Sequence, residues 1–459
     1  MKRPIYALIL AVLFAACESK KEPTTTTISG QITNPKGDVV TFRVDDEGLT
    51  DTLDAENKFS YSFDIDEPQE VRFGHGGEIT YIYLRPGDDL FLTLDTEEFD
   101  ESLRYTGIGS EINNYKAALV LMGDTLLNQR ELFSLPPDSF LLAIQTEQDM
   151  KLSAMQSFNI TDQTFKNNLK GNALWRKRLL LLEYEPSHKY YVKLDSFSVS
   201  EGFYDFKNEV DMNDSTQLKY AYFKHYVQAE IKREASENYN KRQNKEESNY
   251  NFLIGAMDKL TSLEPIKETM IYDILKWDYL DLTEDQRKEY TAKWLSYNPE
   301  QDKIDEIKQE VLQIEKILPG KPAPSFNYAS LEGDTVSLED LHGKVVYIDV
   351  WATWCGPCIR EHPFMEKLQQ RFEGKDVVFI AVDTDSSPEP WRKMVAEKEL
   401  GGIHVYAPGA WEAKIMKDYA IHGIPRFILI DQEGNIVDAD AARPSGDIGD
   451  QIEELLKSA

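Results

Sequence analysis

The fold of this chain is decided by the stretch VVYIDVWATWCGPC, which occupies residues 345–358. Its first six residues, 345–350, are apolar or β-branched except for Asp349, a pattern of the kind that makes a buried strand of a parallel sheet. The run leads directly into two cysteines separated by two residues, and a helical pattern follows from Cys358 to Phe372. Two intervening residues let both sulfur atoms approach bonding distance within one turn. The sequence therefore predicts an α/β region with a dithiol between a strand and a helix.

The two cysteines are expected to carry redox chemistry. Cys355 should lie at the N-terminus of the predicted helix, where unpaired backbone N–H groups and the helix dipole favour a nucleophilic thiolate. A structural zinc site is the alternative, but it needs four ligands. Besides Cys358 the chain offers only Cys17, while His342 and His362 lack a suitable partner pattern. No metal is therefore expected, and His362 is expected at the surface.

A second motif, YAIHGIP at residues 419–425, lies further along the chain. Together with WCGPC at 354–358, it makes residues 320–459 resemble the thioredoxin-fold domain of the TlpA/ResA-like thiol-disulfide oxidoreductases. The resemblance implies an α/β thioredoxin-like fold. The distance between the two motifs exceeds that of a bare thioredoxin by one strand-plus-helix unit, which the resemblance places at residues 389–406.

The resemblance also implies roles for the residues of the first motif. Cys355 matches the attacking cysteine and Cys358 the buried resolving cysteine, and the two would form the redox-active disulfide. Trp354 is expected to shield this disulfide from water. Trp354, Gly356 and Pro357 would line the surface that meets the substrate.

Four residues outside that motif complete the implied active site. Pro425 matches the cis-proline, whose missing N–H and fixed φ keep its loop close to the sulfur atoms. Ile424 before it would offer backbone groups to the substrate main chain. Asp349 matches the buried acid that accepts the proton of the resolving thiol, and Glu361 matches a glutamate with a similar role. Carrying both acids departs from the usual family pattern.

The expected activity is protein-disulfide reduction in the cell envelope, with no cofactor. The Gly356-Pro357 dipeptide lacks a cation that would strongly stabilise the thiolate, which favours a reducing direction. The expected partners are disulfide-bearing envelope proteins, apocytochromes among the candidates, and a membrane thiol donor of electrons. A peroxidase is excluded, because Ala352 and Ile348 stand where peroxiredoxins carry a threonine and a proline.

The net charge of the chain argues against a nucleic-acid-binding function. Its 459 residues include 51 Lys and Arg against 80 Asp and Glu, which gives a formal net charge of -29. Regional net charges are +2 for 1–23, -13 for 24–110, -8 for 111–316 and -10 for 317–459. Binding to nucleic acid requires a basic patch that displaces counterions. No nucleic-acid partner is therefore expected.

The N-terminus has the pattern of a targeting signal. Lys2 and Arg3 precede an apolar run that ends in small residues just before Cys17, and the run is too short to span a bilayer. LFAAC at 13–17 resembles a bacterial lipoprotein signal, which implies lipidation of Cys17; an ordinary secretory signal is the alternative. We expect a signal peptide at 1–16, a tether at 17–27, and a lipid-anchored protein on the periplasmic or surface side of the envelope.

Two further domains are predicted before the thioredoxin-like domain at 318–459. Alternating strand patterns between turns at 28–108 indicate an antiparallel β-sandwich. With SGQI at 29–32 and LRPGD at 84–88, this region loosely resembles an uncharacterised β-rich domain that precedes thioredoxin-like domains in Bacteroidetes lipoproteins. Its acidic runs at 45–47 and 64–67 leave a calcium site as an alternative to a solvated surface.

From 109 to 317 the apolar residues recur with helical spacing, and Thr283 with Gln286 forms a capping box at the start of one helix. The alternative function is an interaction lipoprotein in which these two domains bind a partner and the redox domain is accessory.

Overall fold

A computed structural model of the chain describes residues 24–44, 47–123, 125–242 and 248–457. The predicted signal peptide and Cys17 lie outside these residues, as does most of the predicted tether. The chain divides into two compact units, of which the first ends at Ala256 and the second begins at Met257. Within the described residues, no helix combines the length and the apolar character needed to cross a membrane.

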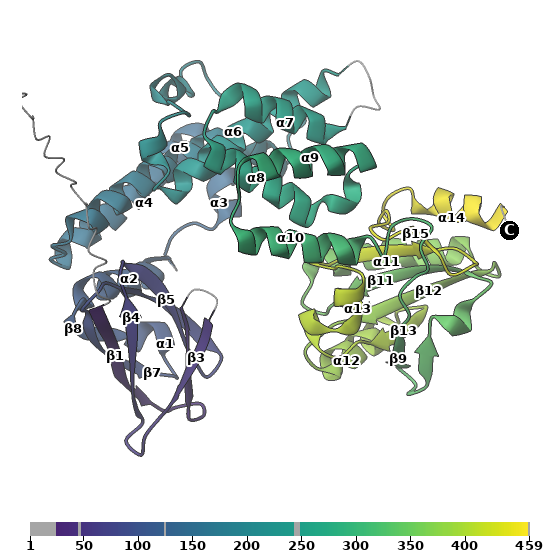
Figure 1. The fold of residues 1–459 in the computed structure, drawn as a ribbon, viewed down its shortest axis with the longest axis horizontal. Helices are drawn as coiled ribbons and strands as arrows, with labels where there is room; N and C mark the ends of the chain where they lie inside the picture. Colours follow the sequence, from purple (N-terminus) through teal and green to yellow (C-terminus); the bar gives the residue numbers. More distant parts are fainter. Residues whose placement is uncertain (1–23, 45–46, 124, 243–247, 458–459) are drawn as a thin grey trace, which may run out of the picture. The chain divides into compact units, whose positions relative to one another are not determined.

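The first unit begins with the predicted β-sandwich (Figure 1). Its two sheets have the strand orders β4-β1-β7-β8 and β3-β2-β5-β6, and β1 with β7 is the parallel pair among otherwise antiparallel neighbours. The strands are β1 (Thr24–Thr33), β2 (Val39–Val44), β3 (Glu47–Thr52), β4 (Lys58–Ile65), β5 (Gln69–His75), β6 (Glu78–Leu84), β7 (Asp89–Asp95) and β8 (Arg104–Ile108), with the short helix α1 (Phe99–Ser102) before β8.

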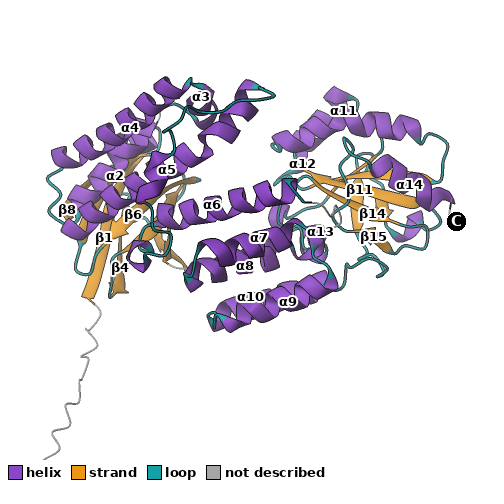
Figure 2. Cartoon of the chain, turned by 90° about the horizontal axis from the view of Figure 1, so that it is seen from above, coloured by secondary structure: helices purple, strands orange, loops and turns teal. Residues whose placement is uncertain are grey.

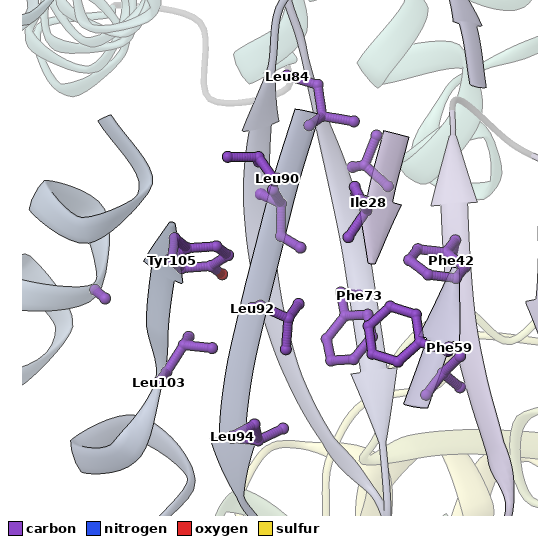
Figure 3. Packing of buried hydrophobic residues seen from close by; sticks show 14 of the residues in the cluster. Ile28, Phe42, Phe59, Phe73, Leu84, Leu90, Leu92, Leu94, Leu103 and Tyr105 are labelled. Carbon is purple, nitrogen blue, oxygen red and sulfur yellow. The ribbon is translucent and has the colours of Figure 1, made fainter. Parts of the chain in front are cut away.

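Aromatic rings from both sheets fill the core of this sandwich (Figure 3). Phe59 of β4 stacks on Phe73 of β5 with ring centroids 5.4 Å apart, and Phe42 of β2 lies 5.5 Å from Phe73. Leu90 and Leu92 alternate with exposed residues along β7 and are fully buried. The period of two seen in the sequence therefore corresponds to one face of each strand turned inward.

The prediction of a tether up to Thr27 is wrong for its last four residues, because β1 already begins at Thr24. Thr26 is fully buried, and its hydroxyl donates to the carbonyl of Arg85 and accepts from the backbone N–H of Gly87, each at 3.0 Å. A Thr-rich run is polar like a linker, yet β-branched threonine also favours strands. Pairing with β4 and β7 makes this run a strand and not a linker.

Helices make up the rest of the first unit. They are α2 (Ser110–Gly123), α3 (Gln129–Ser134), α4 (Pro137–Ser157), α5 (Gln163–Val192), α6 (Ala221–Asn240) and α7 (Asn249–Leu260), with 3-10 turns at Asp205–Glu209 and Ser215–Gln217. The helical spacing of apolar residues predicts α4 to α7, whereas α2 and α3 carry too little periodicity to be found that way. The boundary between the two units falls inside α7.

The second unit opens with three helices, α8 (Glu264–Trp277), α9 (Glu284–Ser296) and α10 (Gln301–Ile314), and a 3-10 turn at Tyr279–Asp281. The capping box is confirmed: the Thr283 hydroxyl accepts from the N–H of Gln286 at 3.3 Å, and the Gln286 side chain accepts from the N–H of Thr283 at 3.0 Å. The apolar side of α10 buries Ile307 and Ile314.

A seven-stranded sheet of order β10-β9-β13-β12-β11-β14-β15 follows. Its inner strand β11 is buried at every residue, runs parallel to β12 and pairs antiparallel with β14. The elements are β9 (Asn327–Ser330), β10 (Thr335–Ser337), β11 (Val345–Trp351), α11 (Gly356–Arg371), β12 (Val377–Asp383), α12 (Pro388–Lys398), β13 (Ile403–Tyr406), α13 (Lys414–Asp418), β14 (Arg426–Ile430), β15 (Ile436–Asp438) and α14 (Ile448–Lys457), with 3-10 turns at Glu339–Leu341 and Ala410–Glu412.

This architecture places the dithiol just after the end of β11. Figure 2 shows α11 and α14 beside the strands of the sheet, and both helices share an apolar cluster with Val345 and Tyr347 of β11. The predicted strand-plus-helix insertion corresponds to α12 and β13, which add one strand beyond β12. The predicted thioredoxin-like fold is thereby confirmed.

Candidate active site

Cys355 and Cys358 form a disulfide in this structure, with their Cα atoms 5.3 Å apart. Cys355 is the N-cap of α11, and its sulfur accepts the backbone N–H of Cys358 at 3.2 Å. The first N–H groups of a helix have no partner inside the helix, so they favour negative charge at this position. In the reduced protein the same geometry would stabilise a thiolate on Cys355, as the sequence predicts.

The helix starts two residues earlier than predicted. α11 begins at Gly356, because Pro357 occupies its first turn, where a residue without an N–H costs no hydrogen bond. Cys355 and Cys358 are 4% and 1% exposed. Their neighbours Trp354, Gly356 and Pro357 are exposed; Trp354 is 61% exposed, and its ring lies 6.1 Å from that of Trp411.

The second motif lies beside the disulfide, and the peptide bond between Ile424 and Pro425 is cis. β14 begins at the next residue, Arg426, which pairs with Val350 near the end of β11. Ile424 packs in the apolar cluster that contains both cysteines. The structure therefore brings together the two motifs, which lie far apart in the sequence.

A pair of residues that sequence reasoning missed holds the loop before Cys355. Asp385 accepts the backbone N–H of Thr353 at 3.1 Å and its hydroxyl at 2.6 Å. Thr384 donates its N–H and its hydroxyl to the carbonyl of Trp351 at 3.0 and 3.2 Å. Both residues follow the carboxyl end of β12, where polar side chains after a buried strand are a signal for a site.

Asp349 lies on β11 and is 3% exposed. No described residue forms a hydrogen bond with its Oδ1 atom. Burial raises the pKa of the Asp349 carboxyl to about 8, and the negative charge of Glu361 adds to the rise. A cavity of about 330 Å³ lies next to this acid, and His362 and His404 are among its lining residues. Asp349 can therefore exchange a proton near neutral pH.

Glu361 projects from α11 and is also buried, at 7% exposed. Its two carboxylate oxygens accept the backbone N–H and the hydroxyl of Ser445, each at 3.0 Å. The two acids thus differ in their hydrogen bonding. Both oxygens of Glu361 accept hydrogen bonds, whereas the Oδ1 atom of Asp349 is buried without one from the described residues. The sequence contains no local signal for Ser445, which lies 84 positions away.

His362 is half-buried, so the expectation of a surface side chain is wrong. Its ring lies 4.8 Å from that of the fully buried Trp351 in an edge-to-face contact. Burial first, and then the nearby Lys398, lower the pKa of His362 to about 4, so the imidazole is neutral at pH 7. Among the described residues, no three His, Cys, Asp or Glu side chains gather closely enough to hold a metal ion.

Comparison with known proteins identifies this part of the chain. Residues 318–451 match the family model described as Redoxin. Thiol-disulfide oxidoreductase ResA of Bacillus cereus is 34% identical over 143 residues, which cover 31% of this chain and 77% of that protein. The chain belongs to the ResA-like thiol-disulfide oxidoreductases. The expectation drawn from the two sequence motifs is confirmed at this level.

Two other proteins are similar to the same part of the chain. Thioredoxin-like protein YneN of Bacillus subtilis (strain 168) is 35% identical over 120 residues, 26% of this chain and 69% of that protein. A solved structure of a putative thiol-disulfide oxidoreductase from Bacteroides vulgatus is 43% identical and covers 30% of this chain and 98% of its own, with a TM-score of 0.29. The family match begins at residue 318, so in this ResA-like protein the sandwich and α2 to α10 are additional.

Proposed function

We propose that this ResA-like protein is a protein-disulfide reductase of the cell envelope, anchored by lipid at Cys17. The observation that carries the proposal is the position of the Cys355 sulfur: it accepts the N–H of Cys358 at the start of α11, beside the cis-proline at 425. A thiolate stabilised in this way is a nucleophile at neutral pH. Sequence supports the anchor, since the apolar run before Cys17 ends in small residues.

The reaction begins with the reduced dithiol. The Cys355 thiolate attacks one sulfur of a substrate disulfide, so that a mixed disulfide forms and the other substrate sulfur leaves as a thiolate. Cys358 then loses its proton and attacks the Cys355 sulfur. This second step forms the Cys355–Cys358 bond and releases the second substrate thiolate. Two electrons pass to the substrate, and a membrane thiol donor restores the dithiol.

Asp349 is the better candidate for the base that takes the Cys358 proton. An efficient base has a pKa near the working pH, and burial raises the pKa of Asp349 to about 8. Glu361, held by Ser445, is a second buried carboxylate, and its negative charge adds to the rise in the pKa of Asp349.

Loss of activity on substitution of the cysteines tests the proposal. Cys355→Ser should abolish the reduction of insulin disulfides, because the remaining Cys358 is 1% exposed and lacks the N-cap position that stabilises a thiolate. Cys358→Ala should keep the first step and accumulate covalent adducts with envelope proteins, seen as bands that a reductant releases. Cys17→Ala is the matched control: it should keep activity and move the protein from the membrane fraction to the soluble fraction.

Two results would contradict the proposal. One is insulin reduction by Cys355→Ser. The other is a reduction potential close to the −120 mV or so of strong disulfide oxidants rather than the −270 mV or so of thioredoxin. Partners that survive reductant and bind the sandwich or the helices, without covalent adducts, would favour an interaction lipoprotein instead.

A further inference from the structure

Helices of the second unit contact the loop that carries the cis-proline. Gln313 of α10 donates its side-chain N–H to the carbonyl of Asp418 at 2.8 Å. One turn earlier on the same helix, Glu310 Oε1 is hydrogen-bonded to His422 Nε2 at 2.7 Å. The ring of Trp277, the last residue of α8, lies 5.1 Å from the His422 ring in an edge-to-face contact.

These contacts hold both ends of one short segment. Asp418 is the last residue of α13, and His422 stands three residues before Pro425. The side chains of Glu310 and His422 are 18% and 35% exposed, so water screens their hydrogen bond less than a surface pair. The position of the loop beside the disulfide therefore depends on α10 as well as on the sheet.

Trp277 has a different environment from Trp294, the tryptophan of α9. Trp294 is buried, whereas Trp277 is 51% exposed although its ring contacts His422 and the Lys276 ammonium lies 4.8 Å from it. A half-exposed tryptophan whose ring already contacts a neighbouring side chain offers a large apolar surface to a ligand, and tryptophan is enriched at the centres of binding sites.

We propose that α8 and α10 belong to the substrate-binding machinery of the oxidoreductase. Trp277 contacts an apolar side chain of an extended polypeptide that flanks the disulfide to be reduced. Glu310 and Gln313 are positioning residues, which act through His422 and Asp418 on the loop that ends at the cis-proline. We assign a substrate polypeptide to this surface because the ring of Trp277 contacts His422, which belongs to the loop that ends at the cis-proline. The inference rests on the proposed function, since it concerns the same substrate.

Two disulfides of different size test the inference in the full-length protein. Insulin presents a polypeptide around its disulfide, whereas 5,5′-dithiobis(2-nitrobenzoate) is a small disulfide with no polypeptide to contact α8. Trp277→Ala should lower kcat/KM for insulin by about five- to tenfold, mainly through KM, as expected for removal of a tryptophan anchor. The rate with the small disulfide should stay within about twofold, and Trp277→Phe should retain most of the activity with insulin.

Glu310→Ala should raise KM for insulin by about threefold or more, since the His422 imidazole loses its acceptor. Glu310→Gln should restore most of the activity, because an amide oxygen can accept the same hydrogen bond. Leu312→Ala is the matched control. Leu312 is 54% exposed on the same helix, and its substitution should leave kcat/KM unchanged for both substrates.

An equal loss of kcat/KM with both substrates in Trp277→Ala would overturn the inference, because Trp277 would then act on the dithiol itself. Unchanged kcat/KM with both substrates would overturn it as well. Binding of S-methylated insulin B chain to the oxidised protein needs no turnover, and Trp277→Ala should weaken it by about fivefold or more. Unchanged binding would contradict the inference. A wild-type protein that binds this chain but does not reduce insulin would contradict the proposed function alone.

Discussion

At the scale of single residues, Asp349 is a carboxyl group almost fully removed from water, at 3% exposed. It lies in β11, where each neighbour along the strand is buried. A carboxylate in such a place loses hydration, and Glu361 adds a second negative charge. The protein therefore retains a proton on Asp349 at pH values where an exposed aspartate is ionised.

This retention predicts how stability changes with pH. The folded pKa of about 8 lies above the ordinary value of 3.8, so between these values the folded protein binds more protons than the unfolded chain and stability falls as pH rises. Asp349→Asn removes the effect. For the oxidised protein we expect a gain in the free energy of unfolding of at least about 1.4 kcal/mol at pH 8, equivalent to one pKa unit, and a smaller gain at pH 5.

Urea unfolding at the two pH values measures this difference. Asp376→Asn is the control, because Asp376 is exposed just before β12 and its substitution should leave the free energy of unfolding unchanged at both. A gain that does not depend on pH, or a loss of stability at pH 8, would contradict the assignment of a raised pKa to Asp349.

At the scale of elements, the sequence predicts best where a local pattern decides the structure. The buried run at 345–350 predicts β11, and the capping box at Thr283 predicts the start of α9. Thr24 to Thr27 fail this test, since threonine suits both a linker and a strand and only pairing with β4 and β7 selects the strand. Boundaries that depend on partners distant in the sequence cannot be found from a local window.

The same limit applies to the candidate site. Each of its two motifs is a continuous stretch of sequence, so the cysteines and the cis-proline could be predicted. The residues that hold them could not: the contacts Asp385–Thr353, Ser445–Glu361 and Glu310–His422 join positions 32, 84 and 112 apart. A single serine or glutamate carries no pattern that would distinguish it from a solvated side chain.

The Ser445–Glu361 contact links α11 to the segment before α14 and can be tested as an interaction between elements. Ser445→Ala leaves one Glu361 oxygen without its protein donor, which should lower the free energy of unfolding by about 1 kcal/mol, because Ser445 is exposed and water can replace part of the bond. Urea unfolding of the single variants and of the double variant with Glu361→Gln gives the coupling energy.

Ser386→Ala, at an exposed serine before α12, is the control and should have no effect. Strictly additive effects of Ser445→Ala and Glu361→Gln would show that the contact does not stabilise the protein.

At the scale of the whole molecule, the division into units differs from what composition suggests. Helical periodicity shows which side of a helix is buried, but it does not show which part of the chain covers that side. The predicted helical region is one stretch in the sequence, yet the boundary between the compact units lies inside α7, so that α8 to α10 group with the redox domain. This grouping is consistent with the proposed contact of Trp277 with the substrate, because α8 and the cis-proline loop belong to the same unit.

The net charge of -29 acts at the same scale, on encounter with the substrate. Summed surface charge steers ligands of opposite sign, and added salt removes the effect as the screening length falls from about 30 Å at 0.01 M to about 8 Å at 0.15 M. A peptide disulfide flanked by lysines should therefore be reduced several-fold faster, in kcat/KM, than the same peptide flanked by glutamates at 0.01 M ionic strength. The difference should shrink at 0.15 M or above, and a glutamine-flanked peptide should change little with salt. A preference for the lysine peptide that persists unchanged in high salt would point to a specific contact instead of the summed charge.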